Sequence, residues 1–162
     1  MPLAPRSSLL KHRALLIDPS SRWAAPLKQA LADLPCRVTP WLPDCQQLAQ
    51  CPDALAQLAA QWQRPGHFPT LVFYHCRPDN LDFLRFWAQA EFSLPLPPLI
   101  ALLDSLDVAA AERLRQLGCV QVHAGFHTWD RLVKTVTPIF QTPVYSDQNL
   151  EELVSANLPW SL

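Results

Sequence analysis

Five short runs of apolar and β-branched residues alternate along the chain with segments that repeat apolar residues at helical spacing. The runs cover about residues 13–18, 36–42, 70–75, 99–103 and 120–124. Four helical segments follow the first, third, fourth and fifth runs, and an interrupted one occupies residues 43–65. Strands that alternate with helices in this way predict an α/β domain with a parallel sheet and helices on both of its faces.

Polar residues mark the predicted helix starts. Ser20 or Ser21, Asp107 and Thr128 each precede an apolar helical pattern, and their side-chain oxygens can accept hydrogen bonds from the first free N–H groups of a helix. Gly118 follows the segment that Asp107 begins, at a position typical of a helix end. The second apolar run contains a proline, which predicts that it lies at a sheet edge.

A chain of 162 residues is long enough for one domain with a substantial core. We expect an irregular leader over residues 1–12, the domain over 13–140 and a tail over 141–162. The tail has several large apolar residues, namely Val144, Tyr145, Leu150, Leu153, Val154, Leu158 and Trp160. Either it packs back on the domain or it docks on a partner, with Trp160 in the anchor.

Composition excludes several classes of function. The net charge of −1 gives no basic footprint for nucleic acid, and no run approaches the length of a membrane span. Only three glycines are present, which argues against a glycine-rich phosphate loop. Five cysteines without CxxC spacing, and without an apolar leader before them, predict free thiols in the cytoplasm.

The third apolar run carries the most specific signal. It reads Pro69-Thr-Leu-Val-Phe-Tyr-His-Cys-Arg-Pro78, so that a proline follows Tyr74 by four positions. The first run ends in Asp18 and the fourth is followed by Asp104. This series resembles the receiver domain of response regulators, the CheY-like family. The resemblance implies a flavodoxin-like three-layer sandwich with strand order 2-1-3-4-5 over residues 13–140.

In that family the third strand ends in the phosphate-accepting aspartate, four residues before a proline, and here the position holds Tyr74. A carboxylate is the nucleophile in that reaction, and a phenol does not replace it at neutral pH. The family's acidic pair, which holds Mg²⁺, corresponds to Asp18 and Pro19, so one carboxylate is missing there as well.

Two further positions of the family's site also differ. The Thr or Ser after the fourth strand corresponds to Leu103 or, with a shift of one, to Asp104 or Ser105. The Lys after the fifth strand corresponds to Gly125. The resemblance therefore implies a degenerate phosphorylation pocket that uses no cofactor or metal, as in a pseudo-receiver.

Two classes of function remain open. The first is a non-enzymatic signalling adaptor that binds another protein, or a second copy of itself, through residues 108–117, 120–124 and 129–140. Gln121, His123, Trp129 and Trp160 are its candidate contact residues. The alternative is a small flavodoxin-like enzyme or a nucleotide-binding domain. Its site would be a crevice at the carboxyl ends of the strands, lined by Asp18, Tyr74, His75 and Asp104.

The remaining polar residues have simpler explanations. We expect Asp18 to cap the loop after its strand or to pair with a nearby donor. Asp104 and Asp107 are expected to cap a helix. His75 and Cys76 are neighbours in a strand and therefore point to opposite faces, which argues against a Cys/His nucleophile.

Zinc could use Cys76, His123 and His127, but no ligand spacing supports such a site. The aromatic residues of the segment after the third strand (Phe83, Phe86, Trp87 and Phe92) are expected to belong to the core and its shell.

Overall fold

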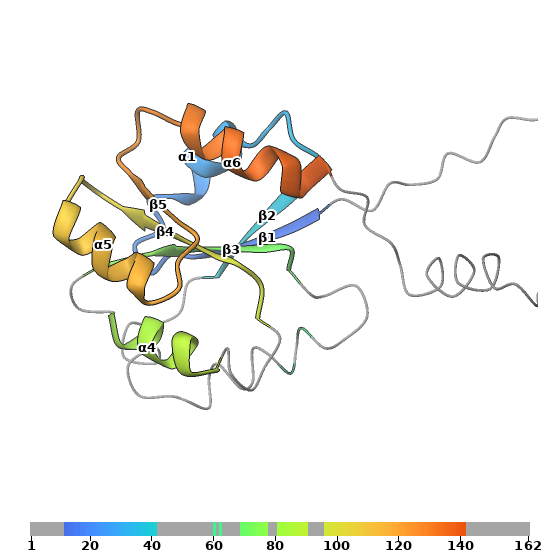
Figure 1. The fold of residues 1–162 in the computed structure, drawn as a ribbon. Coiled ribbons are helices and arrows are strands. Elements are labelled where there is room, and N and C mark those ends of the chain that lie inside the picture. Colours follow the sequence, from blue (N-terminus) through green and yellow to red (C-terminus); the bar gives the residue numbers. More distant parts are fainter. Residues whose placement is uncertain are drawn as a thin grey trace, which may run out of the picture.

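The computed structural model describes residues 12–41, 60, 62, 69–77, 81–90 and 96–141. The strands are β1 (His12–Ile17), β2 (Cys36–Trp41), β3 (Leu71–His75), β4 (Leu99–Leu103) and β5 (Gln121–Ala124), and the helices are α1 (Ala24–Ala30), α4 (Leu81–Ala90), α5 (Val108–Gln116) and α6 (Asp130–Gln141). All strand pairs are parallel, in the order β2-β1-β3-β4-β5. This confirms the predicted three-layer fold, including the edge position of the proline-containing strand β2 (Figure 1).

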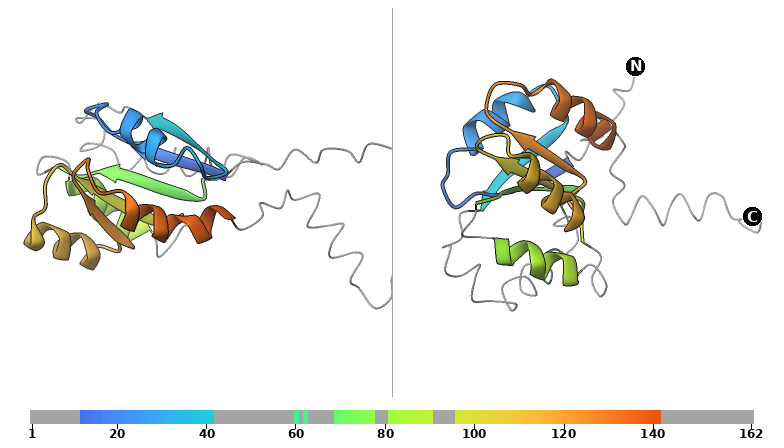
Figure 2. Two further views of the ribbon diagram at one scale, coloured as in Figure 1. Left: turned by 90° about the horizontal axis from the view of Figure 1, so that it is seen from above. Right: turned by 60° about the vertical axis from the view of Figure 1, so that its left-hand side comes forward.

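The sheet separates two apolar clusters. On one face α1 and α6 pack against the sheet, with Trp23, Leu27 and Phe140 among the buried side chains. On the other face α4 and α5 contribute Trp87 and Leu114. Figures 1 and 2 show these helix pairs on opposite sides of the strands. Since neighbouring strand residues point to opposite faces, each strand supplies both clusters.

The ends of α5 follow the sequence prediction. Asp107 is its N-cap residue, and the carboxylate accepts a hydrogen bond from the backbone N–H of Ala110 at 3.1 Å. Gly118 comes just after the helix with φ +96°, a conformation that glycine adopts without strain.

The start of α1 differs from its prediction. Neither Ser20 nor Ser21 caps the helix, which begins at Ala24 after the N-cap residue Trp23. Ser21 has φ +57°, so the chain makes a left-handed turn before the helix begins. α6 begins at Asp130, two residues after the predicted cap Thr128, and the carbonyl of Trp129 accepts its first backbone hydrogen bond, from the N–H of Val133 at 2.9 Å.

Several predictions lie outside the described residues. These concern the leader, the tail from residue 142 on, most of the interrupted segment 43–65, and Phe92. Within that segment Trp62 is described; it is buried and packs edge-to-face on Trp87. Phe83 and Trp87 belong to the core, as predicted. Among the described helices, none has both the length and the apolar character that crossing a membrane would need.

Candidate functional site

Three neighbouring strands bring Asp18, His75 and Asp104 to one edge of the sheet. Asp18 follows β1, His75 ends β3 and Asp104 follows β4, and these strands are adjacent in the order β1-β3-β4. Side chains two positions apart in a strand point to the same face of the sheet. Each of the three residues is two positions after a residue of the apolar cluster under α1 and α6, so their side chains lie on the face that these helices cover. Parallel strands end at the same edge, so the three groups meet there.

The His75 ring bridges the two carboxylates. Its Nδ1 lies 3.1 Å from Oδ1 of Asp18, and its Nε2 lies 3.1 Å from Oδ1 of Asp104. A neutral imidazole carries one N–H, whereas a protonated ring can donate from both nitrogens. The ring is therefore held between two carboxyl groups, each within hydrogen-bond distance of one of its nitrogens. The side chains of His75 and Asp18 are fully buried, and that of Asp104 is 43% exposed.

Asp18 is surrounded by donors. The hydroxyl of Ser20 donates to Oδ1 at 2.6 Å, and the backbone N–H of Ser20 donates to the same oxygen at 3.0 Å. The backbone N–H of Trp23 donates to Oδ2 at 2.8 Å. This confirms that Asp18 caps the turn between β1 and α1, and it explains why Ser20 is not the helix cap: its hydroxyl is committed to the carboxylate.

Asp104 has a different set of partners. Its Oδ2 accepts from the guanidinium of Arg22 at 2.5 Å, and its Oδ1 lies 3.3 Å from the indole Nε1 of Trp23. Asp104 was expected to cap a helix, and that expectation is wrong, since its oxygens bond side chains 81 and 82 residues away. We call Asp18, His75, Asp104, Ser20 and Arg22 the His75 network.

The network lowers the pKa of Asp18. Burial alone would raise it, but hydrogen bonds from His75, Ser20 and the Trp23 N–H outweigh burial and bring the pKa from 3.8 to about 2. A carboxyl whose folded pKa is lowered contributes stability above its unfolded pKa, and that contribution is lost as the pH falls through the folded value.

We therefore expect the free energy of unfolding to fall by about 2 kcal/mol as the pH drops from about 4 to about 2. Urea unfolding at a series of pH values measures this. The matched control is Asp18→Asn, which cannot titrate and should show a shallower slope in the same window. Equal slopes for the two proteins would contradict the assignment.

Tyr74 lies on the opposite face of the sheet from the network. Its ring is fully buried and stacks on Phe83 with the ring centroids 4.9 Å apart. Leu103 also packs in that cluster under α4 and α5. The predicted crevice therefore does not hold all of its four side chains together: Asp18, His75 and Asp104 meet, and Tyr74 is separated from them by the sheet.

The other positions of the predicted pocket lie near the network without entering its hydrogen bonds. Pro19 is half-buried in the turn after β1. Gly125 has φ +82°, and its N–H donates to the carbonyl of Leu103 at 2.9 Å. No heavy atom lies within 4 Å of the place where a Cβ on Gly125 would stand, so the glycine is favoured by its backbone conformation rather than by crowding.

The predicted contact surface needs correction. Gln121 and His123 are buried, because α6 covers the face of β5 on which they lie. Trp129 is half-buried: its ring stacks on His123 with the ring centroids 4.6 Å apart, and its indole N–H donates to the carbonyl of Phe126. Trp160 lies outside the described residues.

Gln121 presents a feature that the sequence did not indicate. Both polar atoms of its amide are buried and lack a hydrogen-bond partner within the described structure. A buried amide without partners is destabilising. We expect Gln121→Met, which keeps the length of the side chain, to raise the free energy of unfolding by about 1–2 kcal/mol. Thermal unfolding measures this, and a lower melting temperature would show that the amide has a partner such as a buried water.

Large apolar side chains are exposed elsewhere. Leu106 is 75% exposed and Val108 is 73% exposed, at the start of α5, and Val120 is 59% exposed just before β5. These residues lie on the side of the sheet where β5 forms an edge. Val108 and Val120 belong to segments that the sequence indicated as a contact surface, although it named other residues there.

The suggested zinc ligands are not brought together. Cys76 packs in the cluster under α4 and α5, whereas His123 lies against Trp23 and Trp129 on the other face. In the part of the chain that is described, no three His, Cys, Asp or Glu side chains are arranged to hold a metal ion. Burial lowers the pKa of His123, and a hydrogen bond to the Gly125 carbonyl partly offsets this.

Sequence analysis missed Arg22 and the indole of Trp23 as members of this site. Arg22 is a single charged residue in a turn, and no spacing relates it to Asp104. The alternation of side chains along the strands was a usable signal. Counted from the apolar residues of each strand, it puts Asp18, His75 and Asp104 on the same face of the sheet and Tyr74 on the opposite face.

Neither a comparison with protein-family models nor one with curated proteins finds a match for this sequence. Solved structures do match its fold. A response regulator from Thermotoga maritima is 17% identical with a TM-score of 0.60, covering 82% of this chain and 99% of that one. The signal receiver domain of a DNA-binding response regulator from Colwellia psychrerythraea is 19% identical with a TM-score of 0.58, covering 80% and 98%.

An orphan response regulator from H. pylori is 12% identical with a TM-score of 0.55, covering 80% of this chain and 97% of that one. At these identities the similarity establishes the fold alone. The chain has the receiver fold, with its five parallel strands in the order 2-1-3-4-5.

Proposed function

We propose that this chain is a pseudo-receiver: a signalling adaptor that does not accept a phosphoryl group and acts through a protein partner. The observation that carries the proposal is the His75 network. Asp18 stands where a receiver holds one acid of its metal-binding pair, and Asp104 stands next to the position of its Thr or Ser. Both carboxylates are already bonded to basic side chains of the same chain, His75 and Arg22.

The network bears on phosphoryl transfer in two ways. Phosphoryl transfer depends on electrostatic positioning, in which metal ions neutralise the charge on the phosphate oxygens. Here a buried imidazole takes the place between the carboxylates, so a divalent cation would have to displace it. The residue at the acceptor position, Tyr74, is a phenol on the other face of the sheet.

Exposed apolar side chains support the adaptor part of the proposal. Leu106 and Val108 are exposed at the start of α5, and Val120 is exposed after its end. Val108 and Val120 belong to the segments for which the sequence predicts a protein contact. A net charge of −1 gives no attraction to nucleic acid. The proposed location is the cytoplasm, on the cysteine spacing of the sequence.

An enzymatic role is less well supported. Ser20, His75 and Asp104 contain the residue types of a nucleophilic triad, and the Ser20 hydroxyl lies 3.3 Å from Nδ1 of His75. That hydroxyl is much closer to Asp18, at 2.6 Å, and His75 is fully buried. A substrate would have to disrupt the network to reach the ring. We therefore propose that the chain has no catalytic activity of its own.

The test is incubation with acetyl phosphate and Mg²⁺, followed by intact-mass measurement, with a phosphorylatable receiver domain as the positive control. We expect no phosphoryl adduct on this chain. An adduct, or a Mg²⁺-dependent NMR shift centred on Asp18 at sub-millimolar metal, would overturn the proposal.

The adaptor part is tested with the same protein. Partner capture by the wild type is compared with capture by Val108→Ser, which removes an exposed apolar group, and by Thr135→Ser, which leaves this side unchanged. We expect Val108→Ser to capture less of the partner and Thr135→Ser to capture as much as the wild type. Equal capture by the two variants would show that the contact lies elsewhere.

A further inference from the structure

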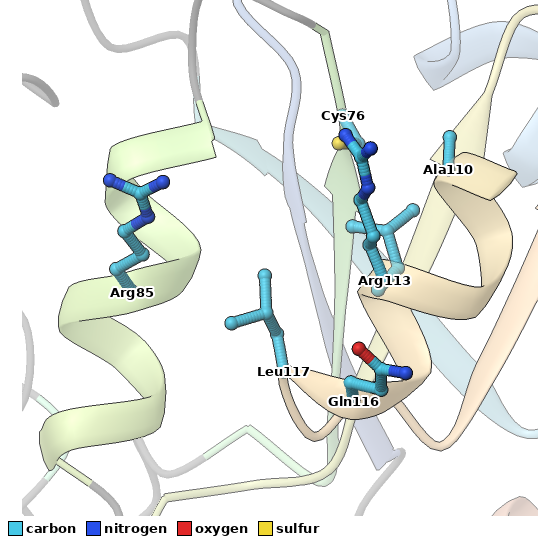
Figure 3. A pocket seen from close by; sticks show the side chains of 7 residues that line it. Cys76, Arg85, Ala110, Arg113, Gln116 and Leu117 are labelled. Atoms are coloured by element: carbon cyan, nitrogen blue, oxygen red, sulfur yellow. The ribbon is translucent and has the colours of Figure 1, made fainter.

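A cavity lies on the face of the sheet opposite the His75 network. It has a volume of about 290 Å³ and lies between α4 and α5. Cys76 and Leu114 line its inner part, and Ala110 and Leu117 add apolar surface from α5. Figure 3 shows the Leu117 side chain extending into the space between the two helices.

Two arginines carry the charge among the described residues that line this cavity. Arg85 reaches it from α4 and Arg113 from α5, and of the described residues that line it none is acidic. Figure 3 shows the Arg85 side chain on α4 and the Arg113 side chain on α5, on opposite sides of the space between the two helices. Burial raises the pKa of the Cys76 thiol to about 11, so the thiol stays uncharged at neutral pH and does not repel an anion.

We propose that this cavity binds a small organic anion, with a flat apolar body between α4 and α5 and an anionic group at Arg85 and Arg113. Guanidinium groups bind carboxylates and phosphates through paired hydrogen bonds. The leucine side chains and the uncharged thiol suit an apolar ring. The volume is at the small end of the range for ligand cavities, which favours a body of one or two rings over a nucleotide.

The site goes beyond the proposed function, because it would give the domain a small-molecule input that needs no phosphoryl transfer. Cys76 directly follows His75, and its backbone N–H donates to the carbonyl of Leu102 at 2.9 Å. A ligand in this cavity would therefore touch the end of β3, one residue after the ring that bridges Asp18 and Asp104.

Four probes test the proposal by NMR titration of the whole chain: 1-naphthoate, 1-naphthyl phosphate, the neutral 1-naphthylmethanol and the cationic 1-naphthylmethylamine. We expect saturable shifts at Ala110, Leu114 and Leu117 with at least one anion, and about tenfold weaker binding of the neutral probe. The two anions distinguish a carboxylate ligand from a phosphate ligand. Equal affinity of the anionic and neutral probes would overturn the proposal, as would shifts confined to other residues.

Three variants locate the site. Arg113→Gln should weaken binding of the preferred anion about tenfold, and Ala110→Leu should weaken it by occupying the cavity without any change of charge. The matched control is Arg115→Gln, on the same helix. Arg115 pairs with Glu112 at 3.4 Å and does not line the cavity, so its loss should leave the affinity unchanged. Equal weakening by Arg113→Gln and Arg115→Gln would indicate general charge attraction and overturn the site.

Unchanged spectra away from α4 and α5 show that each variant is folded. If Ala110→Leu perturbs the whole spectrum, the comparison of Arg113→Gln with Arg115→Gln decides alone, since both side chains are exposed and neither contributes to the core.

Discussion

Replacing His75 with leucine is expected to lower the free energy of unfolding by about 3–5 kcal/mol, because it leaves the buried carboxylate of Asp18 without the imidazole that it bonds. Removing one member of a buried ion pair is costly, since the remaining charge stays out of water without compensation. Ser20 and the Trp23 N–H would still bond Asp18, which limits the loss. Urea unfolding with a check for two-state behaviour measures the change.

Two controls separate the network from simple loss of packing. Arg22→Gln removes the exposed pair with Asp104 and should change the free energy of unfolding by less than about 1 kcal/mol. The double variant Asp18→Asn/His75→Leu should lose less than the sum of the two single variants, because the uncompensated charge is gone. Strict additivity, or a loss below about 1 kcal/mol for His75→Leu, would show that the ring does not stabilise the carboxylates.

The fold was predictable because its signals are local. Each of the five strands is a short apolar run, and each described helix carries an apolar stripe. The Asp107 cap and Gly118 correctly indicated the ends of α5, since the bonds they make lie within a few residues. Pro40 indicated the edge strand for a similar reason: a residue without an N–H cannot take part fully in a central ladder. The strand order came from the resemblance, and periodicity alone does not supply it.

The candidate site was only partly predictable because its bonds join distant segments. His75 bonds Asp18 across 57 residues and Asp104 across 29. The sequence placed all three at strand ends but did not indicate that the ring would bridge the acids. Ser20 was misassigned as a helix cap because Ser is a good cap in isolation, whereas here a buried carboxylate competes for its hydroxyl.

The contact surface was mispredicted for a related reason. Gln121 and His123 are polar residues on an edge strand, and polar residues usually indicate exposure. The face of β5 on which they lie is covered by α6, and burial of this kind depends on the angle at which a helix crosses the sheet. Leu106 and Val108 show the converse, because they are apolar residues at the start of α5 and yet are exposed.

The placement of Tyr74 leads to the second large effect. Tyr74→Asp would restore the residue type of a receiver's acceptor position, yet we expect it to lower the free energy of unfolding by about 4 kcal/mol and to give no phosphorylation. The carboxylate would replace a fully buried ring that stacks on Phe83, in an apolar cluster. It would also face α4 and α5, with the sheet between it and Asp18. Chemical denaturation measures the loss, and intact mass after incubation with acetyl phosphate and Mg²⁺ measures phosphorylation.

The matched control is Tyr74→Phe, which keeps the stacked ring and removes only the hydroxyl. This variant should lose about 1 kcal/mol of its free energy of unfolding, the contribution of a typical hydrogen bond, which is well below the loss expected for the aspartate variant. Because Tyr74→Asp is expected to be poorly folded, phosphorylation is measured at a temperature where the variant shows native-like NMR dispersion. Robust phosphorylation of the folded variant would mean that the new carboxylate reaches Asp18, and therefore that β3 turns its other face toward the network. If Tyr74→Asp were no less stable than Tyr74→Phe, the burial of position 74 against Phe83 would be contradicted instead.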